Sequence, residues 1–284
     1  MVWTGIREWL STRMAFFPPQ PPEYGLTTDE EGELHYNDSF ETQMAKLYPI
    51  ISHQLKVVGC GDTKGSRTKK REIIVCYFRH RKAKNTILFS HGNAVDLGRV
   101  RFFLLYISWK LRVNVVGYDY SGYGHSSGKP TAQSALQDIM ACWKDVTEVE
   151  KFDPKTIILY GQSVGTGPTI YLARKLGNQI RGCILQCPFL SGMRVLRPGL
   201  KHWPCWADIY PNIKDVKKIE VPVLIIHGIK DQVVPVEQGQ KLFDLCKFPV
   251  EPLWVDASHD DVEQSSDFLP RLKRLLKELD RIAQ

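Results

Sequence analysis

Short apolar runs rich in β-branched residues alternate with longer segments of helical periodicity along the chain. The apolar runs predict strands at residues 54–60, 72–78, 86–90, 113–118, from 157 onward, and at 181–186, 223–227 and 251–255. The periodic segments predict helices at residues 131–150, 168–175 and 270–282. Strands that alternate with helices usually form parallel sheets covered on both faces. The pattern therefore predicts an α/β fold with a mainly parallel central sheet and helices on both faces.

A further amphipathic helix is predicted over residues 2–17, followed by a proline-rich connector over residues 18–22. Its apolar face comprises Trp3, Ile6, Trp9, Leu10, Met14 and Phe17. Such a helix either lies in a membrane interface, where Trp and Arg are favoured, or docks on the protein's own surface. We expect residues 1–22 to form this helix and connector, and residues 23–284 to form a single domain.

Two charged segments are predicted to be loops. Residues 29–33 contain four acidic side chains and read as a solvated acidic loop. Residues 61–71 connect the first two predicted strands and carry five Lys or Arg side chains. This connector is either a solvated hairpin tip or a surface that meets phosphate head groups or an acidic partner.

Composition limits the compartment and the partners. The 284 residues carry a net charge of +7, which fits anionic membrane surfaces at least as well as nucleic acid, and we predict no nucleic-acid partner. No apolar run is long enough to span a bilayer, and seven cysteines without a Cys-x-x-Cys pair indicate a reduced cytoplasmic compartment. Cys183 and Cys187 read as small buried side chains, so we predict neither a metal site nor a cofactor. The sequence does not indicate an oligomeric state.

The most informative motif is Gly161-Gln162-Ser163-Val164-Gly165, which lies between a predicted strand and a predicted helix. Strand, sharp turn and helix form the structural context of a nucleophile elbow. The turn is expected to force Ser163 into a strained backbone conformation. Side chains at Gly161 and Gly165 would then collide across the turn, which explains the glycines. The motif predicts a nucleophilic serine.

A serine nucleophile needs a general base, and the chain contains eight histidines. In folds with this elbow the base follows the last strand, and His259 lies four residues after Val255. His91 and His227 each precede a glycine at a strand end, where backbone shaping or core hydrogen bonding is expected. His125 lies in a Gly- and Ser-rich loop and is the rival base.

The acid that orients the base should lie between the serine and the histidine in the chain. Asp231 follows the strand that ends at His227 and meets this order. Asp256 and Asp260 are too near His259 in sequence to orient its ring easily. Asp119 follows an earlier strand and is expected to hold loops together.

A tetrahedral intermediate needs two backbone N–H donors. One is expected from Val164, directly after the nucleophile at the start of a helix. The other is expected from Asn93, or from Ala94, in the loop after strand 86–90. The side chain of Asn93 is then available to tie that loop down.

Motifs along the chain resemble those of the α/β-hydrolases, in particular the branch of α/β-hydrolase domain-containing protein seventeen. The resemblance covers about residues 14–279. It rests on six segments: 15–19 (AFFPP), 90–98 (SHGNAVDLG), 117–124 (GYDYSGYG), 159–165 (LYGQSVG), 191–195 (SGMRV) and 252–255 (PLWV). It implies the α/β-hydrolase fold, with Ser163, Asp231 and His259 as nucleophile, acid and base. Members of this branch from animals begin with a palmitoylated, cysteine-rich segment. This chain has no cysteine before Cys60, which leaves the helix at 2–17 as the candidate membrane contact.

The resemblance further implies removal of S-acyl (palmitoyl) groups from membrane-associated proteins by an enzyme peripheral on the cytosolic face of a membrane. An alternative is a lipase or carboxylesterase that acts on oxygen esters such as monoacylglycerols. A third interpretation is a non-catalytic membrane-interaction module. The segment after Cys187 is too short for a large cap domain, and a short lid containing Phe189, Trp203 and Trp206 is expected there.

Overall fold

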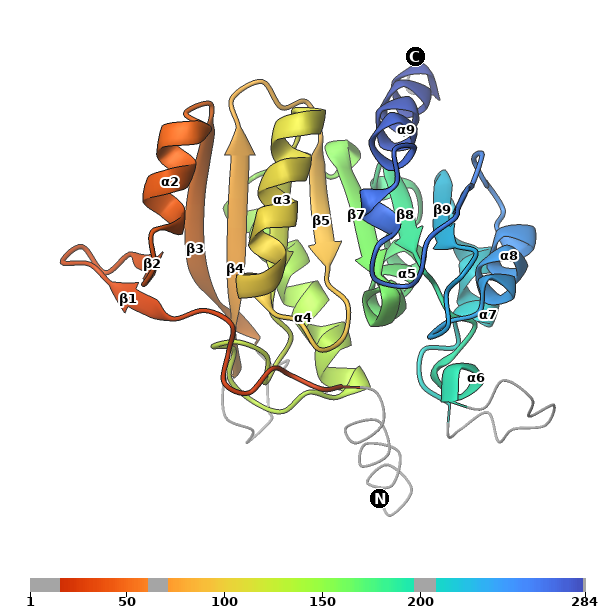
Figure 1. Ribbon diagram of the computed structural model, residues 1–284, viewed down its shortest axis with the longest axis horizontal. Coiled ribbons are helices and arrows are strands. Elements are labelled where there is room, and N and C mark those ends of the chain that lie inside the picture. The colour runs from red at the N-terminus through yellow and green to blue at the C-terminus, as the bar shows by residue number, and fades with distance from the viewer. Residues whose placement is uncertain (1–15, 61–70, 197–207, 283–284) are drawn as a thin grey trace. The chain divides into compact units, whose positions relative to one another are not determined.

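The computed structural model describes residues 16–60, 71–196 and 208–282, which fall into two compact units (Figure 1). The first unit ends at Asp153, and the described part of the second unit comprises residues 154–196 and 208–282. The predicted helix at 2–17 lies outside the described residues except for Phe16 and Phe17, and the connector at 61–70 lies outside them entirely. Trp203 and Trp206 of the predicted lid also lie outside them.

The described residues of the first unit form six strands in the spatial order β1-β2-β3-β4-β6-β5. They are β1 (Leu26–Thr28), β2 (Leu34–Tyr36), β3 (Ile51–Cys60), β4 (Arg71–His80), β5 (Thr86–Ser90) and β6 (Asn114–Tyr118). The long hairpin of β3 and β4 is antiparallel, and the buried strands β5 and β6 are parallel. The two strands predicted before residue 80 therefore exist and run longer than expected.

The helices of the first unit are α2 (Phe40–Leu47), α3 (Leu97–Leu111) and α4 (Ala132–Lys144), which continues into the π-helical turn η1 (Asp145–Val149). Figure 1 shows α3 in front of the strands and α4 behind them. Helix α4 begins with a capping box, in which Thr131 accepts from the backbone N–H of Ser134. The helix predicted from the periodicity of residues 131–150 is confirmed, and Ala135, Ile139 and Trp143 are buried along it.

In the described part of the second unit there are four strands, all parallel. They are β7 (Ile157–Gln162), β8 (Gly182–Gln186), β9 (Val223–Gly228) and β10 (Leu253–Val255), in that spatial order. Its helices are α5 (Thr166–Leu176), α6 (Gly192–Leu196), α7 (Asn212–Asp215), α8 (Val236–Leu245) and α9 (Phe268–Ile282). Short 3₁₀ turns are η2 (Pro154–Thr156), η3 (Ser163–Gly165), η4 (Gly177–Gln179), η5 (Val216–Lys218) and η6 (Val262–Gln264).

The parallel strands of the second unit determine where its polar loops meet. Because β7 to β10 run in one direction, their carboxyl ends lie along one edge of the sheet. Ser163 follows β7 directly, Asp231 lies in the loop after β9, and His259 lies in the loop after β10. The segment between β8 and β9 holds only the short helices α6 and α7 and the turn η5 among its described residues.

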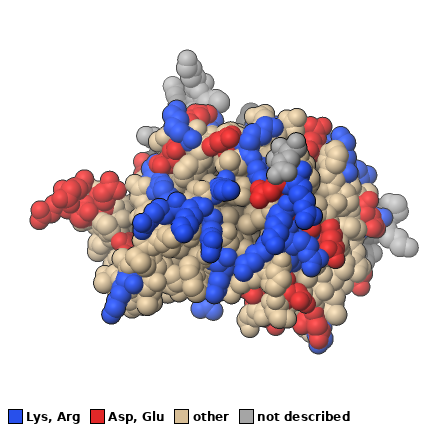
Figure 2. All heavy atoms as spheres, turned by 90° about the horizontal axis from the view of Figure 1, so that it is seen from above, with Lys and Arg blue, Asp and Glu red and all other residues tan. Residues whose placement is uncertain are grey.

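The predicted acidic loop is confirmed as the turn between β1 and β2, where residues 29–33 are all exposed. Figure 2 shows acidic side chains projecting at the end of the molecule where Figure 1 places this turn. Among the helices within the described ranges, none is long and apolar enough to cross a membrane.

Candidate active site

The turn after β7 has the geometry that the elbow motif predicts. Ser163 adopts a positive φ of 51°, in the left-handed region that side chains rarely occupy. A Cβ added at Gly161 would lie 2.6 Å from the carbonyl oxygen of Gly165, and also 2.6 Å from the hydroxyl of Thr169. Backbone cannot move aside as a flexible side chain can, so position 161 accepts only glycine. The strained residue is therefore held by tight packing on both sides of the turn.

His259 lies between Ser163 and Asp231 and contacts both. Its Nε2 is 2.9 Å from Ser163 Oγ, and its Nδ1 is 2.6 Å from Asp231 Oδ2. Because a carboxylate only accepts, Nδ1 carries the proton and Nε2 accepts from the serine hydroxyl. This is the tautomer that a general base for Ser163 requires. Three side chains from three loops thus form one hydrogen-bonded chain in the second unit.

Asp231 is fixed by several donors. Its Oδ1 accepts from the backbone N–H groups of Val233, at 2.9 Å, and Val234, at 2.7 Å. Its side chain is fully buried. Burial by itself would raise the pKa of Asp231, but hydrogen bonds from His227, His259 and the backbone N–H of Val234 together outweigh burial. The pKa therefore lies well below its ordinary value, and the carboxylate stays ionised.

The rival residues have other partners. His125 belongs to the first unit, and its Nε2 lies 2.9 Å from the backbone carbonyl oxygen of Tyr24. Asp256 pairs with Lys230 at 2.7 Å on the surface, and Asp260 is exposed. Asp119 accepts from the hydroxyl of Tyr24 and the N–H of Leu97, so it holds loops together as expected.

The two expected oxyanion donors lie in different units. Val164 belongs to the first helical turn after β7, where backbone N–H groups lack intrahelical acceptors. Asn93 lies in the first unit, and its side-chain oxygen accepts from Phe17 N–H, Tyr123 hydroxyl and Ala94 N–H at 2.7–2.9 Å. The Asn93 side chain therefore ties its loop down, as expected. The backbone N–H of Ala94 is already engaged by the side chain of Asn93 within this loop.

His227 is the residue of this site whose contact was not anticipated. Core hydrogen bonding was expected there, and its Nε2 indeed lies 2.8 Å from the carbonyl oxygen of Val234. The same nitrogen also lies 3.2 Å from Asp231 Oδ2. The four-residue spacing of His227 and Asp231 around the end of β9 was the signal available in the sequence.

Cys187, His227 and Asp231 are buried side chains whose ligand-type atoms all lie within 4.8 Å of one another. Hydrogen bonds already commit both oxygens of Asp231 and the Nε2 of His227. Burial, followed by the charge of Asp231, raises the pKa of the Cys187 thiol and disfavours the thiolate that a metal needs. The donor set therefore favours protein hydrogen bonding over metal ligation.

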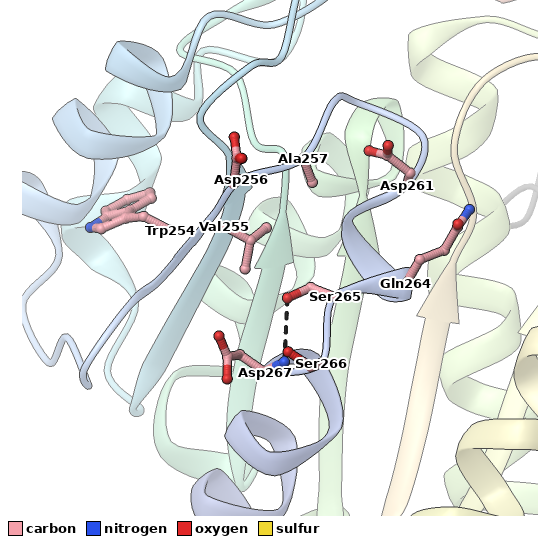
Figure 3. A pocket seen from close by; sticks show the side chains of 9 residues that line it. All are labelled: Trp254, Val255, Asp256, Ala257, Asp261, Gln264, Ser265, Ser266 and Asp267. Carbon is pink, nitrogen blue, oxygen red and sulfur yellow. Dashed lines mark hydrogen bonds between the residues drawn. The ribbon is translucent and has the colours of Figure 1, made fainter.

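The loop that carries His259 also borders a pocket of about 420 Å³ (Figure 3). Its lining includes the carboxylates of Asp256, Asp261 and Asp267, together with the hydroxyls of Ser265 and Ser266. Ser163 is not part of this lining, and a polar wall does not favour an acyl chain. We therefore do not assign the acyl group to this pocket.

Comparison with known proteins identifies the family. The chain is 41% identical over 275 residues to human "Alpha/beta hydrolase domain-containing protein 17B", covering 95% of this chain and 91% of the relative. The chain belongs to the α/β-hydrolase domain-containing protein 17 family. A more distant member of this group of relatives is "Alpha/beta hydrolase domain-containing protein aho-3" of Caenorhabditis elegans. It is 36% identical and covers 93% of this chain and 77% of the relative.

Broader comparisons show the α/β-hydrolase fold. The family model described as "Serine aminopeptidase, S33" matches residues 81–214. Among solved structures, the Pyrococcus furiosus esterase Pf2001 superposes with a TM-score of 0.64 at 18% identity, covering 80% of this chain and 93% of that one. Mouse "Alpha/beta hydrolase domain-containing protein 10" gives 0.55 at 15% identity, covering 81% and 100%. The family and the fold together identify this chain as a hydrolase with the α/β-hydrolase fold.

Proposed function

We propose that this protein is a serine hydrolase that removes S-acyl groups from membrane-associated proteins through an acyl-enzyme intermediate. The observation that carries the proposal is the hydrogen-bonded chain from Ser163 through His259 to Asp231. A serine hydroxyl is a poor nucleophile at neutral pH unless a base takes its proton. Here the base is in contact with the hydroxyl, and a carboxylate holds its proton on the opposite nitrogen.

In the acylation step, Ser163 Oγ forms a bond to the carbonyl carbon of the thioester while His259 Nε2 takes the hydroxyl proton. The oxyanion is stabilised by the N–H of Val164, and Asn93 is the sequence-based candidate for the second donor. The carbon–sulfur bond then breaks, and His259 returns the proton to the departing cysteine thiolate. Asp231 stabilises the imidazolium that exists between these two transfers.

In the deacylation step, water attacks the serine ester and gives a proton to His259 Nε2. The carbon–oxygen bond to Ser163 breaks, and His259 returns the proton to Ser163 Oγ. A fatty acid leaves and the free hydroxyl is restored. No cofactor or metal takes part in these steps.

The thioester substrate rests on the family resemblance, because the hydrogen-bonded chain supports acyl transfer without specifying the leaving group. The test is a panel of acyl thioesters and monoacylglycerols turned over by one preparation, with Ser163→Ala as the control. We expect serine-directed fluorophosphonate labelling together with faster thioester turnover. Faster glyceride turnover would favour the lipase alternative. Failure of the wild type to label or to turn over any ester would favour the non-catalytic module.

We also propose that the protein is cytoplasmic and contacts membranes peripherally through residues 2–17. Support comes from the amphipathic pattern of this segment and the net charge of +7. Removal of residues 2–17 is expected to reduce flotation with anionic vesicles several-fold. Neutral vesicles serve as the control for the electrostatic contribution. Equal flotation of the full and shortened chains would contradict this contact.

A further inference from the structure

We propose that His227 is a positioning residue for Asp231, and that Gly239 provides the space in which its ring is seated. This inference rests on the proposed function, because its consequence is the rate at which His259 works on Ser163. The observation behind it is that Asp231 Oδ2 lies between two imidazoles. His259 Nδ1 is 2.6 Å from this oxygen, and His227 Nε2 is 3.2 Å from it.

The proton on His227 can be assigned from its neighbours. Nε2 lies near two oxygens, Val234 O at 2.8 Å and Asp231 Oδ2 at 3.2 Å, and both can only accept. Nε2 must therefore carry a proton, which it donates to Val234 O, and Asp231 Oδ2 lies 3.2 Å from the same N–H group. Nδ1 is buried and has no hydrogen-bond partner among the described residues. A second proton there would leave a buried donor unsatisfied, which favours the singly protonated ring.

Two hydrogen bonds and one close polar contact link His227, Val234 and Asp231 in the loop after β9. Val234 accepts from His227 through its carbonyl and donates to Asp231 Oδ1 through its N–H, at 2.7 Å. His227 thereby holds both the carboxylate and the backbone that orients it. With His259 as its only imidazole contact, the carboxylate could rotate about its Cβ–Cγ bond and turn Oδ2 away from His259. The polar N–H group of His227, 3.2 Å from Oδ2, attracts this oxygen and opposes that rotation.

The opposite side of the ring is packed against helix α8. A Cβ added at Gly239 would lie only 2.4 Å from His227 Nδ1. Gly239 is buried on α8, and His227 has no exposed side-chain area. The ring therefore cannot retreat, and any side chain at position 239 would push it toward Val234 and Asp231.

Three variants test this role, with kcat and KM measured on the ester that the wild type turns over best. His227→Leu removes the donor and is expected to lower kcat by about 100-fold, the size of effect that a misplacement of about 1 Å can cause. KM is expected to stay within about twofold, because the lost contact does not touch substrate. His227→Gln keeps an N–H donor at similar reach and is expected to recover most of the lost rate.

Gly239→Ala displaces the ring without removing any hydrogen-bonding group, and is expected to lower kcat by about tenfold or more. Gly182→Ala is its matched control, because a Cβ there would approach the side-chain ends of Leu279 at 3.2 and 3.3 Å and the carbonyl oxygen of Pro222 at an ordinary contact distance of 3.5 Å. Unfolding curves correct each rate for the folded fraction. If His227→Leu does not fold, His227→Gln and Gly239→Ala still decide the question.

A spectroscopic signature separates positioning from simple loss of stability. The proton between His259 Nδ1 and Asp231 should give a downfield ¹H resonance in the wild type. We expect this resonance to shift or broaden in His227→Leu and Gly239→Ala, and to be unchanged in Gly182→Ala. Unchanged kcat and an unchanged resonance in folded His227→Leu or Gly239→Ala would overturn the inference. A wild type that hydrolyses no ester but shows the resonance would instead overturn the proposed function.

Discussion

Alanine at position 163 is expected to lower kcat for acyl transfer by roughly a million-fold, the loss seen when a serine nucleophile is removed from a working triad. The reason is that, among the described residues of the second unit, Ser163 supplies the only hydroxyl in hydrogen-bond contact with His259 Nε2. Without Oγ there is no acyl-enzyme, and the remaining backbone donors can only assist direct attack by water. That residual catalysis is small.

The measurement is single-turnover hydrolysis with excess enzyme, together with intact mass to detect the acyl-enzyme. Ser258→Ala is the matched control, because this hydroxyl lies in the loop of His259 and donates to Asp261 Oδ1, at 2.8 Å. We expect acylated mass for the wild type and for Ser258→Ala, and none for Ser163→Ala. An acyl adduct on the Ser163→Ala protein would mean that another residue is the nucleophile.

Strands β5 and β9 could be predicted because every residue in them is buried. Each contains a continuous apolar run, at residues 87–89 and 223–226, and the structure places β5 at the predicted residues, with β9 one residue longer. Helix α3 was not predicted, for a related reason. Phe102, Tyr106 and Trp109 are exposed on the side opposite its buried residues, so apolar side chains occur all round the helix. The helical period is lost in such a pattern.

The short elements between residues 26 and 47 show a second reason why some elements could not be predicted from the sequence pattern. Strands β1 and β2 have three residues each, and α2 has eight, which is too short for a clear period. These elements are specified by tertiary contacts instead. Tyr36, for example, stacks on His53, and the guanidinium of Arg101 lies 4.4 Å from the Tyr36 ring centre. Such contacts cannot be inferred from local sequence.

At the site, the motif and the order of the strands were enough to bring Ser163, Asp231 and His259 together. The chain order of nucleophile, acid and base is a property of the sheet, so sequence position carries spatial information. The contact of His227 with Asp231 could not be predicted in this way. A spacing of four residues does not fix the backbone path after β9, and that path is what brings the two side chains to 3.2 Å.

Asparagine at position 231 is expected to lower kcat/KM by about 10⁴-fold, as when the acid of a Ser-His-Asp triad is replaced by its amide. The carboxylate presents an acceptor to donors on both sides, the N–H groups of Val233 and Val234 on one and the two imidazoles on the other. An amide has one oxygen and one NH₂ group, so its NH₂ group must face either the two backbone N–H groups or the two imidazoles. Facing His259, it favours the tautomer with the proton on Nε2, which cannot accept from Ser163.

The same mismatch is expected to destabilise the fold of the Asp231→Asn protein. A buried donor without an acceptor costs about 1–3 kcal/mol, so we expect the free energy of unfolding at pH 7 to fall by about that amount or more. Urea unfolding measures it. Asp256→Asn is the control, because its exposed pair with Lys230 contributes little. Wild-type activity in folded Asp231→Asn protein would remove Asp231 from its proposed role.

The stability that Asp231 contributes also predicts a dependence on pH. Burial alone would raise the pKa of this carboxyl, but the hydrogen bonds from His227 and His259 lower the pKa by a larger amount. Its folded pKa therefore lies below the unfolded value of about 3.9. A depressed pKa stabilises the folded state above the unfolded pKa, and this contribution is lost as the pH falls toward the folded pKa. We expect the wild type to lose more free energy of unfolding than Asp231→Asn between about pH 5 and pH 3, so that the two curves converge on acidification. Parallel curves over this range would show that the ionised carboxylate does not stabilise the fold.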